Sequence, residues 1–178
     1  NAGCLHRLCA AVYYEGRKDP ISARLIALNA AGKKSFFSSA TFNAPMKLLL
    51  LSTTVGALGS GLGGGVELTL HNIAHEMRRR GHIINIVAPD GSVMGDLPIV
   101  EIAGELQITA QTQERNAPAI VPAHSVLANM WDYARQVQSE WDLIVNFAYD
   151  WLPFYLTPFF HCPIAHLVSM GSLSDVMD

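Results

Sequence analysis

The sequence is poor in charged residues and in cysteine, and it lacks a long apolar run. Only 15% of the 178 residues are charged, whereas 50% are hydrophobic. This balance excludes a disordered or low-complexity chain, because such chains are poor in apolar residues. No uninterrupted apolar run reaches the roughly 18 to 20 residues that a membrane-spanning helix needs. The most apolar stretch, Trp151–Phe160, is short and contains two prolines. The composition therefore indicates a globular domain without a transmembrane segment.

Cysteine and histidine provide no pattern typical of a structural metal or a disulfide framework. Cys4, Cys9 and Cys162 are an odd, widely scattered set, which predicts neither disulfides nor a zinc site. His71 and His75 are four residues apart, but the sequence offers no third ligand near them. We therefore expect no metal and a reducing, cytoplasmic location.

The charge changes sign along the chain. Residues 1–45 carry six basic and two acidic residues, whereas residues 46–178 carry six basic and thirteen acidic residues. Three interpretations of residues 1–45 stay open: a transit-like peptide, sequence upstream of a start at Met46, or a linker left from a preceding domain. Within this extension, Ile21–Ala31 is compatible with a helix. We place no function in this extension. Residues 46–178 are acidic overall, which argues against nucleic-acid binding despite the basic run Arg78–Arg80.

Strand and helix patterns alternate from residue 46 onward. Short apolar runs typical of buried parallel strands are separated by segments with helical spacing of apolar residues. The expected strands are 47–52, 82–88, 99–102, 106–109, 142–147 and 163–169, and the expected helices are 65–80, 125–140 and 151–160. This alternation predicts an α/β fold, with a Rossmann-like, mostly parallel sheet and helices on both faces.

A glycine-rich loop, Thr53–Gly64, lies between the first strand and the first helix. Such a loop presents backbone N–H groups and the positive end of a helix, an arrangement that suits a phosphate. Gly59–Gly64 matches the dinucleotide fingerprint G-x-G-x-x-G, with Asp90 as the acid for a ribose. However, the fingerprint should begin directly at the strand end, and six residues intervene. The sequence also lacks the GK[ST] of a nucleoside-triphosphate loop.

Several segments carry a family resemblance. Met46–Ser52, Gly63–Glu67 and Asn72–His82 resemble the opening of the retaining glycosyltransferases of the GT-B fold, family four, group 1, in which a GG-V-E loop precedes a helix ending in L-x-x-x-G-H. Asn146–Thr157 and Ala165–Asp178 are similar to the cyanobacterial UDP-glucose:tetrahydrobiopterin glucosyltransferases within that group. The resemblance covers residues 46–178.

The resemblance implies two Rossmann-like domains with the active site between them. Residues 46–178 would then be part of the N-terminal, acceptor-side domain, and the donor domain with its Glu-x7-Glu motif is expected to be absent from this chain, which alone would be inactive. Gly63, Gly64 and Gly65 would contact the donor diphosphate. Glucose would pass from UDP-glucose to tetrahydrobiopterin with retention, with UDP-sugar as co-substrate and neither a cofactor nor a metal.

The residues after the expected strand 142–147 depart from the family pattern. Many members carry a histidine there, whereas this chain has Tyr149, Asp150 and Trp151. Asp150 is our candidate catalytic residue, and with Tyr149 it would take over the contacts of the missing histidine. A pterin acceptor would donate to the Asp150 carboxylate from its guanidine-like edge, and its flat ring would stack on Tyr149 or on Trp151. Asp150 is equally placed to cap a helix. The remaining candidates for sugar or acceptor contacts are Glu67, His166 and Ser169.

Each of these candidates has a structural alternative. Glu67 lies in the first turn of a helix and favours the helix dipole, and His166 suits a hydrogen-bonded core histidine. Two other functions also stay open. The first is a nicotinamide- or flavin-dependent oxidoreductase built on Gly59–Gly64, and the second is a non-catalytic module that binds a nucleotide or sugar.

Overall fold

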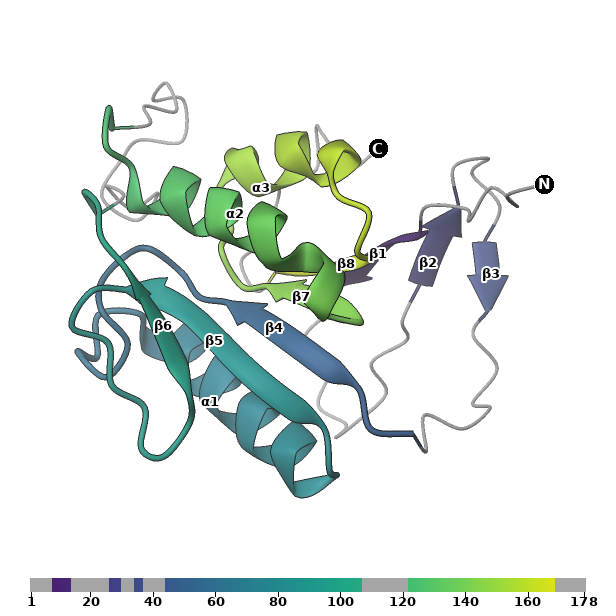
Figure 1. The fold of residues 1–178 in the computed structure, drawn as a ribbon, viewed down its shortest axis with the longest axis horizontal. Helices are drawn as coiled ribbons and strands as arrows, with labels where there is room; N and C mark the ends of the chain where they lie inside the picture. Colours follow the sequence, from purple (N-terminus) through teal and green to yellow (C-terminus); the bar gives the residue numbers. More distant parts are fainter. Residues whose placement is uncertain (1–7, 14–25, 30–33, 37–43, 107–121, 169–178) are drawn as a thin grey trace.

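Five parallel strands form the centre of the molecule. The computed structural model describes residues 8–13, 26–29, 34–36, 44–106 and 122–168. The central strands lie side by side in the order β6-β5-β4-β7-β8 (Figure 1), and all neighbours in this group are parallel. The five strands are β4 (Lys47–Leu51), β5 (Ile83–Pro89), β6 (Ile99–Ile102), β7 (Leu143–Asn146) and β8 (Ile164–Val168). Numbered along the chain, this is the order 3-2-1-4-5 of a doubly wound sheet.

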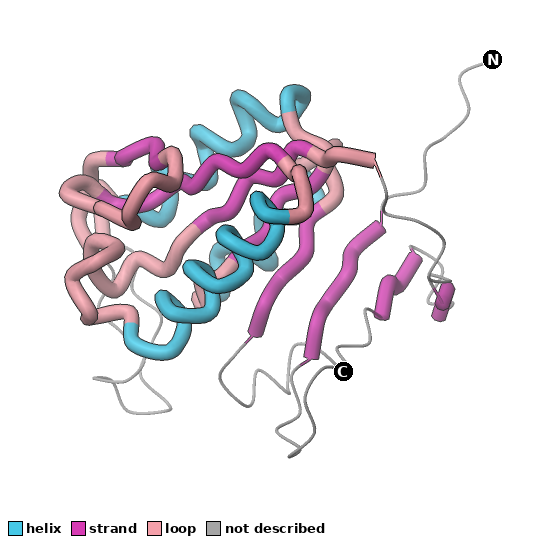
Figure 2. Tube along the Cα trace, turned by 90° about the horizontal axis from the view of Figure 1, so that it is seen from below, coloured by secondary structure: helices cyan, strands magenta, loops and turns pink. Residues whose placement is uncertain are grey.

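Helices cover both faces of this sheet, as Figure 2 shows from below. One face carries α1 (Gly64–Arg79), and the other carries α2 (Val126–Val137) and α3 (Trp151–Leu156). Single 3-10 turns, η1 (Gln138–Glu140) and η2 (Thr157–Phe159), extend α2 and α3. The predicted α/β fold with helices on both faces is therefore confirmed. None of the helices in the described part of the chain has the length and apolar character needed to cross a bilayer.

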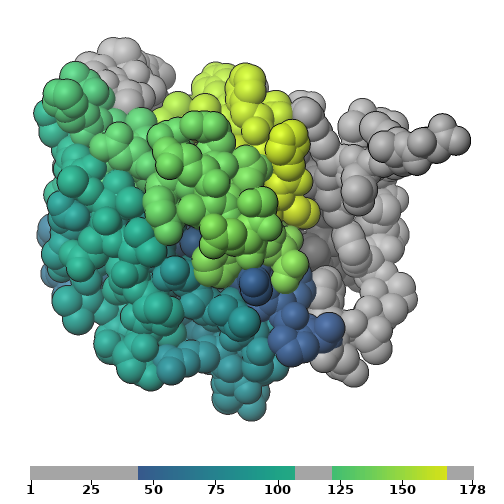
Figure 3. Space-filling model, in the orientation of Figure 1, coloured from purple at the N-terminus to yellow at the C-terminus, as the bar shows by residue number. Residues whose placement is uncertain are grey.

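The central strand β4 explains why both faces must be covered. Leu48 and Leu50 face the cluster under α1, whereas Leu49 and Leu51 face the cluster under α2. All four side chains are buried. Alternate residues of a strand point to opposite faces, so a run of consecutive leucines is stable only between two apolar layers. In the space-filling view, the green residues of α2 form one of these layers (Figure 3).

The first helix has a clear apolar side and a clear end. Its buried residues are Val66, Leu70 and Ala74, at four-residue spacing on one side of the helix. The N–H group of His82 bonds to the carbonyl of Met77, and Gly81 has a φ of 90°. This is the left-handed conformation in which glycine commonly ends a helix. The helix therefore ends where the sequence predicts.

Three short strands extend the sheet beyond β8. The first, β1 (Leu8–Tyr13), pairs in parallel with β8, and β2 (Ile26–Asn29) and β3 (Lys34–Phe36) follow in antiparallel pairs. The helix expected over Ile21–Ala31 is therefore wrong at residues 26–29. The local preference of this segment is weak, and pairing with strands on both sides satisfies its backbone groups instead.

The strand expected at 106–109 is not found at its only described residue. Leu106 lies outside any strand, and residues 107–109 lie outside the described residues. The neighbouring Glu105 forms an isolated bridge with Ser125, the residue that precedes α2. The chain at this point therefore contacts the start of a helix rather than adding a strand.

Two loops at the carboxyl edge of the sheet are bonded to each other. The N–H group of Leu58 donates to the Ser92 hydroxyl at 2.9 Å, and the N–H group of Val93 donates to the Leu58 carbonyl at 2.9 Å. Gly59 follows with a φ of 87°. A Cβ atom at Gly59 would lie 2.5 Å from the carbonyl oxygen of Val93, so only glycine fits here.

Gly59→Ala tests this contact against a matched control. Gly61 also has a positive φ, 79°, but a Cβ atom there would meet nothing within 4 Å. We expect Gly61→Ala to lower the free energy of unfolding by about 1 kcal/mol, the cost of the left-handed conformation. We expect Gly59→Ala to lower it by about 2–4 kcal/mol, because the clash adds to that cost. Urea unfolding measures both values. An equal loss of the free energy of unfolding in the two variants would contradict the close contact between Gly59 and the Val93 carbonyl.

Candidate functional site

The strand order places two loops at the position where doubly wound sheets bind ligands. β4 and β7 are neighbours, with Leu51 opposite Asn146 at their carboxyl ends. The chain leaves β4 into the glycine-rich loop toward α1 and leaves β7 toward α3, on the opposite face. In open α/β sheets the crevice at such a reversal point is the usual ligand site.

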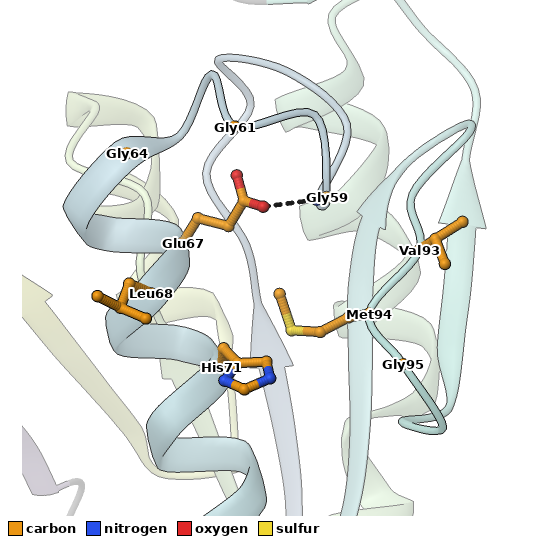
Figure 4. A pocket seen from close by; sticks show the side chains of 9 residues that line it. All are labelled: Gly59, Gly61, Gly64, Glu67, Leu68, His71, Val93, Met94 and Gly95. Carbon is orange, nitrogen blue, oxygen red and sulfur yellow. Dashed lines mark hydrogen bonds between the residues drawn. The ribbon is translucent and has the colours of Figure 1, made fainter.

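A pocket of about 350 Å³ opens beside the glycine-rich loop (Figure 4). It lies between the first two turns of α1 and the loop that follows β5. Its volume is in the range of small-molecule sites. The pocket is lined by Gly59, Gly61, Gly64, Glu67, Leu68, His71, Val93, Met94 and Gly95.

The carboxylate of Glu67 points from α1 into the concave side of this loop (Figure 4). Its Oε1 atom accepts a hydrogen bond from the N–H group of Gly59 at 2.6 Å. Its Oε2 atom is buried and has no hydrogen-bond partner. Gly63 lies against it, because a Cβ atom at Gly63 would be 3.1 Å from Oε2. Glu67 therefore places a negative charge at the loop that was predicted to bind phosphate.

The predicted phosphate contacts lie at the start of α1. Gly63 is the N-cap residue, and Gly64 and Gly65 are the first two residues of the helix. No side chain of the described residues caps this end. The N–H group of Gly64 bonds weakly to the Gly61 carbonyl at 3.4 Å, and the other N–H groups of the first turn are placed as at an anion site. However, no lysine or arginine is among the residues that line the pocket. A diphosphate would have backbone N–H groups, the helix end and the imidazole of His71 to bind, and it would face Glu67. The diphosphate assignment stays a prediction.

The geometry of the loop is unfavourable for a dinucleotide. β4 ends at Leu51 and α1 begins at Gly64, so the loop spans residues 52–63. Its first part is buried, with Ser52, Thr53 and Thr54 each no more than 3% exposed. A dinucleotide fingerprint instead needs a tight turn directly after the strand. The buried segment occupies the end of β4, where that turn would lie.

The second loop presents a carboxylate that bonds to no other side chain in the described part of the chain. Asp150 occupies the N-cap position of α3, but its side chain makes no capping hydrogen bond. The predicted capping role of its side chain is therefore wrong in this structure. Burial raises the pKa of Asp150, and its own backbone N–H group opposes this only in part. Burial and the neighbouring charge of Asp150 also raise the pKa of Tyr149. Asp150 is not among the residues that line the pocket, but a half-buried carboxylate with a raised pKa near the carboxyl end of a parallel strand is typical of a functional group.

His166 belongs to a buried polar network below this loop. Its Nδ1 atom lies 3.1 Å from Asn146 Nδ2, and its Nε2 atom lies 2.9 Å from Thr157 Oγ1. Burial lowers the pKa of His166 to about 4, so the ring is neutral at pH 7. The ring stacks on Phe154, with centroids 4.5 Å apart. Both ring nitrogens are thus engaged within the protein, which matches the hydrogen-bonded core histidine that the sequence left open.

Two further residues, Trp151 and Ser169, were predicted to contact the sugar or the acceptor. Trp151 is the first residue of α3 and is partly buried, beside Asp150. Ser169 lies outside the described residues. Contacts of Tyr149, Trp151, Glu67 and His166 with a sugar or an acceptor stay predictions.

Sequence reasoning overlooked three polar residues near the crevice. Asn146 and Thr157 hold His166, and nothing in their local sequence indicates this, because the partners are 20 and 9 residues away. Thr54 is 1% exposed, and its hydroxyl has no hydrogen-bond partner. The Thr53-Thr54 pair directly after a leucine run is a signal that could have indicated polar groups at the strand end.

The described residues contain no group of three or more potential metal ligands. The rings of His71 and His75 contact each other, with centroids 4.3 Å apart. The thiol of Cys162 is buried, which raises its pKa to about 11 and makes it a poor nucleophile. The groups that this part of the chain presents near the two loops are carboxylates, hydroxyls, aromatic rings, the imidazole of His71 and backbone N–H groups.

Comparison with known proteins leaves the family open. No protein-family model matches the chain, and no curated protein sequence matches it significantly.

Glu67→Gln tests whether the glycine-rich loop binds phosphate against an opposing charge. The glutamine oxygen keeps an acceptor for Gly59, but the negative charge is removed. We expect the affinity for pyrophosphate to rise about tenfold at low ionic strength, because like charges repel. Calorimetric titration measures it, with Glu140→Gln, an exposed acid after α2, as the control. Weaker binding in Glu67→Gln would instead assign Glu67 to ligand binding. Absence of binding in all three proteins would contradict the phosphate contacts.

The pH dependence of stability tests the buried state of His166. Its pKa is about 4 in the folded chain against an ordinary value of 6.5, so between these values the unfolded chain binds more protons. The free energy of unfolding is then lost as the pH falls from 6.5 toward 4, by up to about 1.4 kcal/mol per pH unit. In His166→Gln, which has no titrating ring, we expect a correspondingly shallower decline. Urea unfolding at several pH values measures the free energy of unfolding of both proteins. If it declines equally with pH in the unaltered chain and in His166→Gln, a buried, neutral His166 is contradicted.

Proposed function

We propose that this chain forms the acceptor-side half of a hexosyltransferase of the retaining GT-B type. In this proposal glucose passes from UDP-glucose to tetrahydrobiopterin, and the crevice between β4 and β7 holds the acceptor. The parallel sheet with the order 3-2-1-4-5 supports the proposal, because this architecture binds ligands at that crevice. The resemblance of residues 46–178 to these transferases supports the choice of reaction. A second domain would supply most of the donor site.

The single observation that carries the proposal is the Asp150 carboxylate. It lies four residues after the end of β7, it is half-buried, and its side chain forms no capping bond. Its own backbone N–H group offsets the loss of water only in part, so a ligand that donates further hydrogen bonds to it would recover more of that cost. A pterin presents two adjacent N–H donors on its guanidine-like edge, which match the two oxygens of a carboxylate.

The flanking aromatic residues suit the rest of such a ligand. Tyr149 and Trp151 flank Asp150, and both are partly buried. Flat pterin rings gain binding energy by stacking on aromatic side chains. Asp150 would thus orient the acceptor, and the two rings would hold its plane.

The proposed transfer follows from the resemblance. The acceptor hydroxyl attacks the anomeric carbon on the face from which the diphosphate leaves, and the departing diphosphate assists removal of the hydroxyl proton. Asp150 contributes by holding the acceptor in place, which lowers the entropic cost of the reaction. This scheme requires no metal. Gly63, Gly64 and Gly65 would contact the departing diphosphate through their N–H groups.

Asp150→Asn tests the acceptor site in the 178-residue chain. We expect biopterin, the air-stable oxidised form of the acceptor, to bind the unaltered chain and quench its tryptophan fluorescence. Asp150→Asn should weaken this binding about ten- to hundredfold, because a hydrogen bond to a charged group contributes about 1.5–3 kcal/mol. Affinity should also fall with acidification at a pH above the ordinary aspartate pKa of 3.8, since burial raises this pKa.

The control is Asp132→Asn, which alters an exposed aspartate paired with Arg135 on α2. It should bind biopterin like the unaltered chain. Equal affinity in Asp150→Asn and the unaltered chain would contradict the acceptor site. Binding of NADH in place of biopterin would favour the oxidoreductase alternative.

A further inference from the structure

We propose that His166 is a positioning residue that fixes the Asp150 carboxylate in the crevice through two separate chains of hydrogen bonds. This inference rests on the proposed role of Asp150. Neither His166 nor its partners Asn146 and Thr157 would touch the ligand. Their effect would be to set the path of the backbone on both sides of Asp150.

The first chain begins at the end of β7. The side chain of Asn146 holds both backbone groups of Ala148: its Oδ1 atom accepts from the Ala148 N–H group at 3.1 Å, and its Nδ2 atom donates to the Ala148 carbonyl at 2.7 Å. Ala148 lies two residues before Asp150. The direction in which the chain leaves the sheet toward Asp150 is thus set by one buried amide.

The imidazole of His166 accepts the remaining amide proton of Asn146. Because the N–H group of Ala148 can only donate, it fixes which end of the amide is oxygen. Asn146 Nδ2 is then a donor to His166 Nδ1, which must carry no proton. Asn146 is fully buried and His166 is 4% exposed, so no water replaces this bond cheaply.

The second chain leads to the other side of Asp150. With Nδ1 unprotonated, the neutral ring carries its proton on Nε2 and donates it to Thr157 Oγ1 at 2.9 Å. The Thr157 hydroxyl donates in turn to the carbonyl of Pro153 at 2.8 Å. Pro153 lies three residues after Asp150, in the first turn of α3. One imidazole therefore connects the segments on both sides of the carboxylate.

Packing keeps the ring in this orientation. Phe154 stacks on it at a centroid distance of 4.5 Å and an angle of 23°, and Trp131 lies nearly parallel to it at 6.2 Å and 10°. Every side-chain N–H and O–H group of the chain from Asn146 to Thr157 donates a hydrogen bond, and the Pro153 carbonyl accepts from both the hydroxyl and the backbone N–H group of Thr157. A fully satisfied buried network has few alternative arrangements, which is the property that a positioning element needs.

Two substitutions at His166 separate hydrogen bonding from packing. His166→Phe keeps an aromatic ring for the stack but breaks both chains. His166→Gln offers one acceptor oxygen and one donor N–H group in a single side chain, so it can restore both bonds. We expect biopterin affinity to fall about tenfold in His166→Phe and to stay within about threefold of the unaltered chain in His166→Gln.

The tautomer gives a readout that does not depend on ligand binding. We expect the 15N NMR spectrum of the unaltered chain at pH 7 to show a neutral His166 with its proton on Nε2. If His166→Phe shows no cooperative unfolding and is therefore not folded, Thr157→Val serves as the second variant. It keeps the shape of the side chain and breaks only the hydrogen bonds that lead to Pro153. It should weaken biopterin binding at least threefold.

Three results would overturn the inference. The first is normal biopterin affinity in His166→Phe or, if that variant does not fold, in Thr157→Val. The second is an affinity in His166→Gln as low as in His166→Phe, and the third is a His166 proton on Nδ1. Failure of the acceptor site itself gives a different result. In that case Asp150→Asn binds biopterin with the affinity of the unaltered chain. If only the positioning role fails, Asp150→Asn binds biopterin weakly, whereas His166→Phe binds it with normal affinity.

Discussion

The structure depends on the burial of both faces of β4. Its consecutive leucines are stable only when apolar layers cover the sheet on both sides. The chain meets this constraint by sending α1 to one face and α2 and α3 to the other. The change of face between the connection after β4 and the connection after β7 creates a crevice at the carboxyl edge. The position of the candidate site is therefore a consequence of how the core is built.

Much of this fold could be predicted from the sequence, because its signals are local. The leucine run predicts a strand. The spacing of Val66, Leu70 and Ala74 predicts a helix, and the glycine at residue 81 predicts its end. The pairing of β1 to β3 could not be predicted, since it depends on partners such as β8 that are more than a hundred residues away. The segment 26–29 illustrates this, as its weak helical preference yields to strand pairing.

The candidate site was predictable in position but not in its interactions. Sequence reasoning placed Asp150 and the glycine-rich loop at the strand ends, because the edge of a parallel sheet is known once the strands are known. It did not show that Glu67 reaches back to Gly59 across eight residues. Nor did it show that Asn146 and Thr157 engage both nitrogens of His166. Such side-chain bonds depend on rotamers and on loop paths, which the spacing of residues does not encode.

The two loops of the crevice differ in electrostatic character, and this difference shapes the proposal. The glycine-rich loop offers N–H groups but faces the Glu67 carboxylate, whereas the loop after β7 offers the half-buried Asp150 carboxylate, which makes no capping bond, next to aromatic residues. A ligand with N–H donors and a flat ring therefore suits the second loop. The most direct test is an NMR measurement of saturation transfer from aromatic protons of the chain to biopterin, repeated after Tyr149→Leu and Trp151→Leu. The account predicts that transfer to the pterin ring falls in both variants, and unchanged transfer in both would contradict it.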